Sequence, residues 1–139
     1  MAELELGSAA MAQVVVWGLR GQLESRRTVL SDAINAAVMS ALDYPAEKRF
    51  HRFIGLEPED FIYPPDRGAD YTVIEISMFA GRSEQAKRQL ITELFRRIAD
   101  DAGIAPHSVE ITITETPRVN WGIRGQNAAD LALNYSVEV

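Results

Sequence analysis

Hydrophobic positions in the first half of the chain follow the pattern of a strand, a helix and a second strand. The run QVVVW at 13–17 is rich in β-branched residues, which is typical of a strand. A polar turn is predicted at 18–21. From 23 to 42 apolar residues recur every three or four positions, which indicates a helix with one buried face. Pro45 closes this helix, and 48–56 predicts the second strand.

The second half repeats this order. Residues 71–79, YTVIEISMF, alternate as a strand does, and a turn at 80–83 follows. Ser83 is a suitable N-cap for the next helix, with Glu84 in its first turn. Gly103 ends that helix and Pro106 prevents its return. A last strand is predicted at 109–114, where Val109, Ile111 and Ile113 share one face.

The two halves align without a gap at a shift of about sixty residues, which indicates duplicated β-α-β units at about 12–56 and 71–115. Each helix is long enough to cross over the sheet, so the two strands of a unit are expected to be parallel. The predicted fold class is α+β, with a four-stranded sheet and two helices on one face. The other face needs a cover, and a further subunit is the expected one.

The remaining segments frame a single domain at 12–139. Residues 1–11 are interpreted as a leader or a cloning scar, and 116–139 as a hairpin and a final strand that includes 134–139. The segment 57–70 is predicted to be a loop anchored by Phe61, Ile62 and Tyr63. Long loops of this kind are often functional, and a simple connector packed by its aromatic residues is the favoured alternative.

Composition narrows the classes of function. The chain has 139 residues, no cysteine, a net charge of −6 and a pI near 4.9. The absence of cysteine excludes disulfides, thiol catalysis and cysteine-bound metals. An acidic chain does not favour nucleic acid as a partner, although a local basic cluster can still bind a small anion. No apolar run is long enough to span a membrane and no secretory signal is evident, so we expect a cytoplasmic protein.

The usual catalytic and cofactor motifs are weak. The two histidines, His51 and His107, have no acidic partner at a ligand spacing, so neither a metal site nor a cofactor is expected. His51 is a candidate general acid or base, and a structural role is the alternative. No arrangement of Ser, His and Asp suggests a nucleophilic triad.

Two motifs in the second half resemble a known family. The segments MFAGRSEQAKRQLITELFRRI and GIAPHSVEITITETPRVNWGIRG are similar to the tautomerase superfamily, which includes 4-oxalocrotonate tautomerase and malonate semialdehyde decarboxylase. The specific match covers about 71–125, and the first half fits the same unit more loosely. The resemblance implies a homotrimer and keto-enol proton transfer on a small carboxylate-bearing substrate.

The resemblance also assigns roles to residues. Arg82 matches an arginine that binds the substrate carboxylate and stabilises the enolate, and Arg20 lies near the equivalent place in the first half. Arg49 falls where the family can have another arginine. The matching position in the second half is Glu110, which either weakens an anion pocket or binds the substrate by a hydrogen bond. Trp121 corresponds to an aromatic wall of the pocket, and a lid over the core is the alternative.

The chain departs from the family at the amino-terminal proline that serves as general base. No proline follows Met1 or Met11, and the register places the catalytic position between Ala10 and Ala12. Removal of Met11 exposes a primary amine at Ala12, which can act as a base. A catalytically inactive trimeric member that binds small molecules or serves as a scaffold is therefore the alternative function. Without the resemblance, two β-α-β units also fit a small-molecule-sensing regulatory module.

Overall fold

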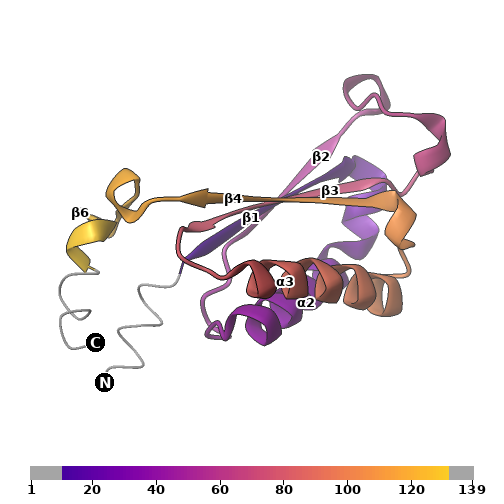
Figure 1. The fold of residues 1–139 in the computed structure, drawn as a ribbon. Helices are drawn as coiled ribbons and strands as arrows, with labels where there is room; N and C mark the ends of the chain where they lie inside the picture. The colour runs from indigo at the N-terminus through magenta and orange to yellow at the C-terminus, as the bar shows by residue number, and fades with distance from the viewer. Residues whose placement is uncertain (1–10, 132–139) are drawn as a thin grey trace.

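The computed structural model describes residues 11–131 and contains the two predicted β-α-β units. The first comprises β1 (Ala12–Leu19), α2 (Arg20–Leu42) and β2 (His51–Leu56). The second comprises β3 (Thr72–Phe79), α3 (Glu84–Arg97) and β4 (Val109–Thr116). The strands form one sheet in the order β2-β1-β3-β4, parallel within each unit and antiparallel where the units meet. Both helices lie on the same face of this sheet (Figure 1), so the predicted architecture is confirmed.

The connection between β1 and α2 differs from the prediction. No turn separates them, because β1 continues to Leu19 and α2 begins at Arg20. Leu19 has an extended backbone and leads directly into the helix. Gly55 makes room for this entry, since a Cβ there would lie 2.9 Å from the Cα of Arg20. The predicted turn at 18–21 was therefore wrong, and a glycine on the neighbouring strand explains why the helix can begin so early.

The other boundaries depend on local signals. The side chain of Ser83 accepts a hydrogen bond from the backbone of Ala86, so the predicted N-cap of α3 is confirmed. A π-helical turn, Ile98–Ala102, extends α3 until Gly103, which has the left-handed backbone that suits glycine. The strand predicted from residue 48 begins only at His51, because Lys48 still belongs to a turn closed by a hydrogen bond to Pro45.

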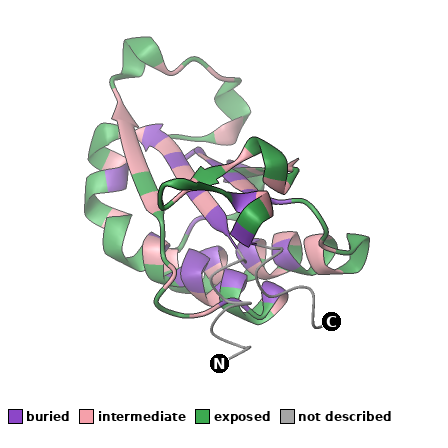
Figure 2. Ribbon diagram, turned by 90° about the vertical axis from the view of Figure 1, so that its left-hand side faces the viewer, coloured by how far each residue is buried: buried purple, intermediate pink, exposed green. Residues whose placement is uncertain are grey.

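The core lies between the helices and the sheet (Figure 2). Alternate residues of the central strands point towards the helices, and the apolar stripes of both helices meet them. The fully buried members include Val14, Val16, Ile74, Ile76, Leu30, Ile34, Leu90 and Leu94. This packing fixes the sheet register, because a slip of one residue would turn each strand's apolar set to the other face.

The opposite face of the sheet carries side chains that are half-buried or exposed. Val15 and Trp17 of β1 lie on it beside Val73 and Glu75 of β3, and Trp17 donates a hydrogen bond to Glu75 of 2.9 Å. No helix within residues 11–131 covers this face (Figure 1). The structure also has no helix in that range that is long and apolar enough to cross a membrane.

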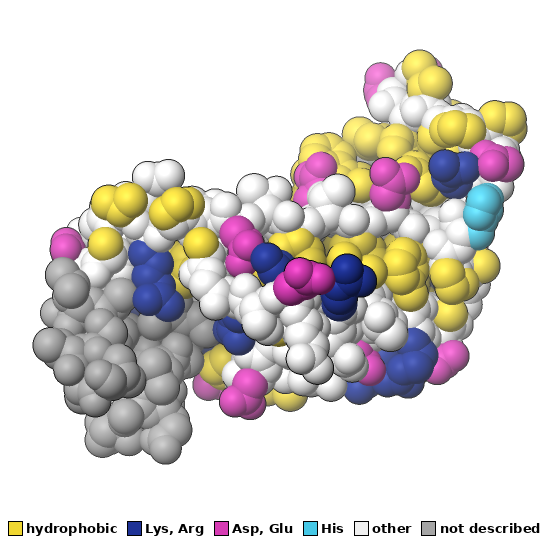
Figure 3. Space-filling model, in the orientation of Figure 1, with side chains coloured by type: hydrophobic (Ala, Val, Ile, Leu, Met, Phe, Trp, Pro, Cys, Tyr) yellow, Lys and Arg dark blue, Asp and Glu magenta, His cyan; other side chains and the backbone are white. Residues whose placement is uncertain are grey.

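The segment between β2 and β3 is held by aromatic side chains. It contains two short 3-10 turns, Pro58–Asp60 and Pro65–Arg67. The rings of Phe61, Tyr63 and Tyr71 pack on one another with centroids 4.7 to 5.7 Å apart, and hydrophobic side chains gather over this part of the surface (Figure 3). Ile62 is 91% exposed, so its predicted role as an anchor was wrong. It lies between the two anchoring rings and does not join them.

A short hairpin follows β4. Its strands are β5 (Gly122–Ile123) and β6 (Gln126–Asn127), joined by Arg124 and Gly125, which both have positive φ. Two consecutive residues with positive φ are what a two-residue hairpin turn requires. The hairpin brings Trp121 and Ala128 back together through a backbone hydrogen bond of 2.8 Å. The strand predicted at 134–139 lies outside the described residues.

Candidate functional site

The start of β1 meets the end of β3 and the segment that follows β4. The antiparallel register sets Ala12 opposite Met78, and the backbone N–H of Phe79 donates to the carbonyl of Met11 at 3.2 Å. Met11, Phe79 and Ala128 are buried against one another, with Trp121 packed beside them. We call the group Ala12, Tyr44, Phe79, Arg82, Arg118 and Trp121 the Ala12 cluster.

Tyr44 ties Ala12 to the end of the first helix. The backbone nitrogen of Ala12 donates a hydrogen bond of 3.0 Å to the Tyr44 hydroxyl, and both residues are buried. Burial raises the pKa of Tyr44 above its usual value, which keeps the phenol neutral at physiological pH. A neutral hydroxyl is therefore in contact with the nitrogen that the family resemblance makes chemically important.

Arg82 supplies a cation close to the Tyr44 hydroxyl. Its guanidinium donates to the carbonyl oxygen of Leu42 at 2.6 Å, which holds the side chain beside Tyr44. Burial lowers the pKa of Arg82 and the charge of Arg118 lowers it further, while Tyr44 and Asp43 oppose the change. An arginine remains protonated under these conditions. The site thus holds a half-buried positive charge.

Arg118 and Trp121 complete the cluster from the segment after β4. The ring of Trp121 meets Phe79 edge to face at a centroid distance of 4.9 Å, and the guanidinium carbon of Arg118 lies 5.3 Å from the Phe79 centroid. The Nε of Arg118 is buried and has no hydrogen-bond partner within residues 11–131. A buried donor without a partner is costly unless a ligand or water satisfies it.

Glu115 links the end of β4 to α3. It accepts a hydrogen bond of 2.8 Å from Lys87 of α3, and its other carboxylate oxygen is buried without a hydrogen-bond partner within residues 11–131. The hydrogen bond from Lys87 is the main reason that the pKa of Glu115 lies below its usual value, and the backbone N–H groups of Gly81 and Arg82 also lower it. The carboxylate therefore lies close to the loop that carries Arg82.

Arg20 and Glu110 lie at the other end of the sheet. Ala12 begins the eight-residue strand β1 and Arg20 directly follows it, a span of about 25 Å at the usual rise per residue. Arg20 forms an exposed ion pair of 2.7 Å with Glu57. Glu110 accepts a hydrogen bond of 2.7 Å from Tyr71, and burial together with this contact raises the pKa of Tyr71 to about 12. Within one chain these residues do not meet the Ala12 cluster.

Arg49 and His51 are also apart from the cluster. Both lie at the edge of the sheet against α2, where Arg49 contacts Ser31 and Asp32, and His51 contacts Ser31. The structure therefore distributes the predicted site residues over three places. It joins Ala12, Arg82 and Trp121, and it adds Tyr44 and Arg118, which the sequence had not singled out. Within residues 11–131 no three His, Cys, Asp or Glu side chains gather as metal ligands.

Comparison with protein families identifies the class of protein. Residues 48–124 match the family model described as tautomerase enzyme. The chain is 35% identical to 2-hydroxymuconate tautomerase of Comamonas testosteroni over 57 residues, which is 41% of this chain and 90% of the relative. The same enzyme of Pseudomonas putida is 33% identical over 57 residues, with the same coverage. The chain belongs to the tautomerase family, and the predicted resemblance is confirmed.

Solved structures extend the match to the first half. Malonate semialdehyde decarboxylase superposes with a TM-score of 0.76 at 20% identity, over 88% of this chain and 97% of its own. A fused 4-OT described as an asymmetric trimer also has a TM-score of 0.76, at 24% identity, over 86% of this chain and 98% of its own. At these identities the likeness shows the fold alone, and it extends over both β-α-β units.

Proposed function

We propose that the protein catalyses keto-enol proton transfer on a small carboxylate-bearing substrate, and that the Ala12 cluster is its active site. The observation that carries this proposal is the position of two arginines and an aromatic side chain around the start of β1. The family match and the similarity to 2-hydroxymuconate tautomerases support the same type of reaction.

The arginines bind and stabilise negative charge. Arg82 and Arg118, whose Nε has no hydrogen-bond partner within residues 11–131, hold the substrate carboxylate and the oxygen that becomes negative in the enolate. Phe79 and Trp121 provide an apolar surface for the carbon skeleton. A partly desolvated site strengthens these interactions, because fewer water molecules compete with the guanidinium groups.

The base is the amine of Ala12 in a chain that begins there. This amine removes the proton of the enol hydroxyl and returns it to carbon as the ketone forms, so the reaction is a simple isomerisation. The neighbouring positive charges of Arg82 and Arg118 lower the pKa of an amine and favour its free-base form. The Tyr44 hydroxyl orients the nitrogen through the bond that it makes to Ala12.

The chain is proposed to act as a homotrimer. The sheet face that carries Val15 and Trp17 has no helix over it within residues 11–131, and fused 4-OT is described as a trimer. Arg20 and Glu110 lie far from Ala12 in one chain, so they join the active site only if a neighbouring subunit supplies them. Sedimentation equilibrium tests the assembly, and a monomeric mass at micromolar concentration argues against it.

Steady-state kinetics with single variants test the site. In a chain that begins at Ala12, Arg82→Gln is expected to lower kcat/KM for ketonisation of phenylenolpyruvate by about 100-fold, the usual effect of losing a charge-stabilising donor. Arg88→Gln is the matched control, because Arg88 is an exposed arginine of α3 that forms an ion pair with Glu84. If both variants are as active as the wild type, Arg82 is not part of the active site. A chain that binds phenylenolpyruvate through Arg82 but does not convert it is the inactive alternative.

A further inference from the structure

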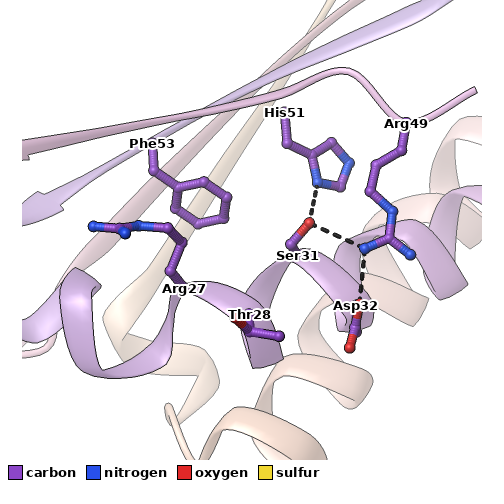
Figure 4. A pocket seen from close by; sticks show the side chains of 7 residues that line it. All are labelled: Arg27, Thr28, Ser31, Asp32, Arg49, His51 and Phe53. Carbon is purple, nitrogen blue, oxygen red and sulfur yellow. Dashed lines mark hydrogen bonds and ion pairs between the residues drawn. The ribbon is translucent and has the colours of Figure 1, made fainter.

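A cavity lies between α2 and β2, on the edge of the sheet. Its volume is about 360 Å³, and its walls include Arg27, Ser31 and Asp32 of α2 and Arg49, His51 and Phe53 at the edge strand (Figure 4). None of these residues belongs to the Ala12 cluster. The cavity therefore calls for its own explanation.

A connected set of polar groups forms one end of the cavity. Arg49 Nη1 donates to Ser31 Oγ at 3.3 Å and to Asp32 Oδ1 at 2.7 Å, while Ser31 Oγ lies 2.8 Å from His51 Nδ1 (Figure 4). Since Ser31 accepts from Arg49, its own proton is free to bond to His51 Nδ1. A bond in this direction corresponds to the neutral tautomer with the proton on Nε2, which is the tautomer that the proposal below requires. His51 then presents an N–H donor beside the Arg49 guanidinium.

The charge of the cavity and its apolar wall determine which class of ligand it can bind. Two arginines face one aspartate, so the cavity has an excess of positive charge. Phe53 packs partly against the core and turns an aromatic surface to the other end, away from Arg49 (Figure 4). Asp32 stands beside Arg49 and disfavours a dianion such as phosphate, for which Phe53 also offers no partner. A monoanion with an apolar group fits both ends of the cavity, because its charge can contact Arg49 and its apolar group can contact Phe53.

We propose that this cavity binds a small aromatic carboxylate, with the carboxylate at Arg49 and His51 Nε2 and the ring against Phe53. The site is separate from the proposed active site and does not depend on catalysis. The ion pair of Arg49 with Asp32 is exposed and contributes little to stability, so a ligand can share the guanidinium at small cost. The Nε and the second terminal nitrogen of Arg49 leave room for a two-pronged contact with a carboxylate.

Benzoate titrated into the full chain tests the proposal, with the ring resonances of His51 as a local signal. We expect these resonances to shift with saturation on adding benzoate. The neutral analogue benzyl alcohol is expected to bind at least about tenfold more weakly, because it lacks the charge-assisted contact. Arg49→Gln is expected to weaken benzoate binding about tenfold or more. Arg82→Gln is expected to leave the His51 response unchanged.

Two further variants distinguish the loss of a ligand contact from a general loss of folded structure. Phe53→Leu keeps an apolar side chain in the core. It is expected to weaken the binding of benzoate more than the binding of acetate, because acetate has no ring. Arg88→Gln is the surface control and is expected to bind as the wild type does. Unmoved His51 resonances at high benzoate overturn the proposal, and so does a response that Arg82→Gln abolishes and Arg49→Gln does not. Tighter binding of inorganic phosphate than of benzoate overturns the assigned ligand class.

Discussion

His51 makes stability depend on pH in a way that a single substitution can reveal. Its ring lies mostly out of water against α2, with Arg49 next to it, and burial followed by the charge of Arg49 lowers the pKa of His51 to about 4. The charged groups around it are Arg49 on its own strand segment and Asp32 and Arg27 on α2. The imidazole is therefore neutral in the folded protein at pH 5, where it is protonated in the unfolded chain.

The direction in which stability changes with pH follows from the difference between the folded and unfolded pKa values of His51. Between pH 6.5 and 4 the unfolded state binds more protons at residue 51 than the folded state does, so stability falls as the pH falls through this range. The contribution of neutral His51 is complete above the unfolded pKa. The full difference in pKa corresponds to about 3 kcal/mol, and partial exposure of the ring reduces it, so we expect about 1–2 kcal/mol.

Urea denaturation at pH 7.0 and pH 4.5 measures the effect. Wild type is expected to lose about 1–2 kcal/mol more than His51→Gln between the two conditions. Carboxylates with lowered pKa values, such as Glu93 and Glu115, destabilise both proteins alike at low pH, so the comparison cancels them. His107→Gln is the matched control and is expected to follow the wild type. An identical pH dependence in His51→Gln and wild type refutes the reasoning.

Three other changes have defined outcomes. Tyr44→Phe leaves the buried backbone N–H of Ala12 without its partner and is expected to cost about 1–3 kcal/mol in urea denaturation; Tyr63→Phe removes a more exposed hydroxyl and is the control, and an equal loss in both contradicts the argument. Gly55→Ala forces a Cβ against the Cα of Arg20 and is expected to cost about 1–3 kcal/mol, seen as a lower Tm. Gly21→Ala meets no atom within 4 Å inside α2 and is expected to stabilise by up to about 1 kcal/mol, so a lower Tm here means that the start of α2 is strained.

The fold was predictable because the signals agree at several levels. The apolar spacing gave strands and helices, and the shift of about sixty residues showed that they form two equal units. Parallel pairing within a unit then follows from the length of the helix. The entry into α2 was mispredicted because the two glycines at 18 and 21 look like turn residues locally. The deciding contact, Gly55 against Arg20, joins positions far apart in the chain.

The site was predictable only in part. The motif that contains Arg82 and the hairpin that contains Trp121 pointed to residues that the structure does bring near Ala12. Tyr44 and Arg118 were missed, because their partners Ala12 and Phe79 are distant in sequence. Arg118 had one available signal, since it is a basic residue three positions before Trp121. Arg20 could have been set apart from Ala12 at once, because the two stand at opposite ends of one strand.

The measurement that tests the central claim most directly compares two forms of the chain for ketonisation of phenylenolpyruvate. One form begins at Met1, and the other is confirmed by mass to begin at Ala12. The account predicts turnover by the form that begins at Ala12, and its loss when the free amine is blocked by acetylation, because the nitrogen beside Tyr44 is then an amide. Equal turnover by both forms, or turnover that survives acetylation, contradicts the assignment of the Ala12 amine as the base.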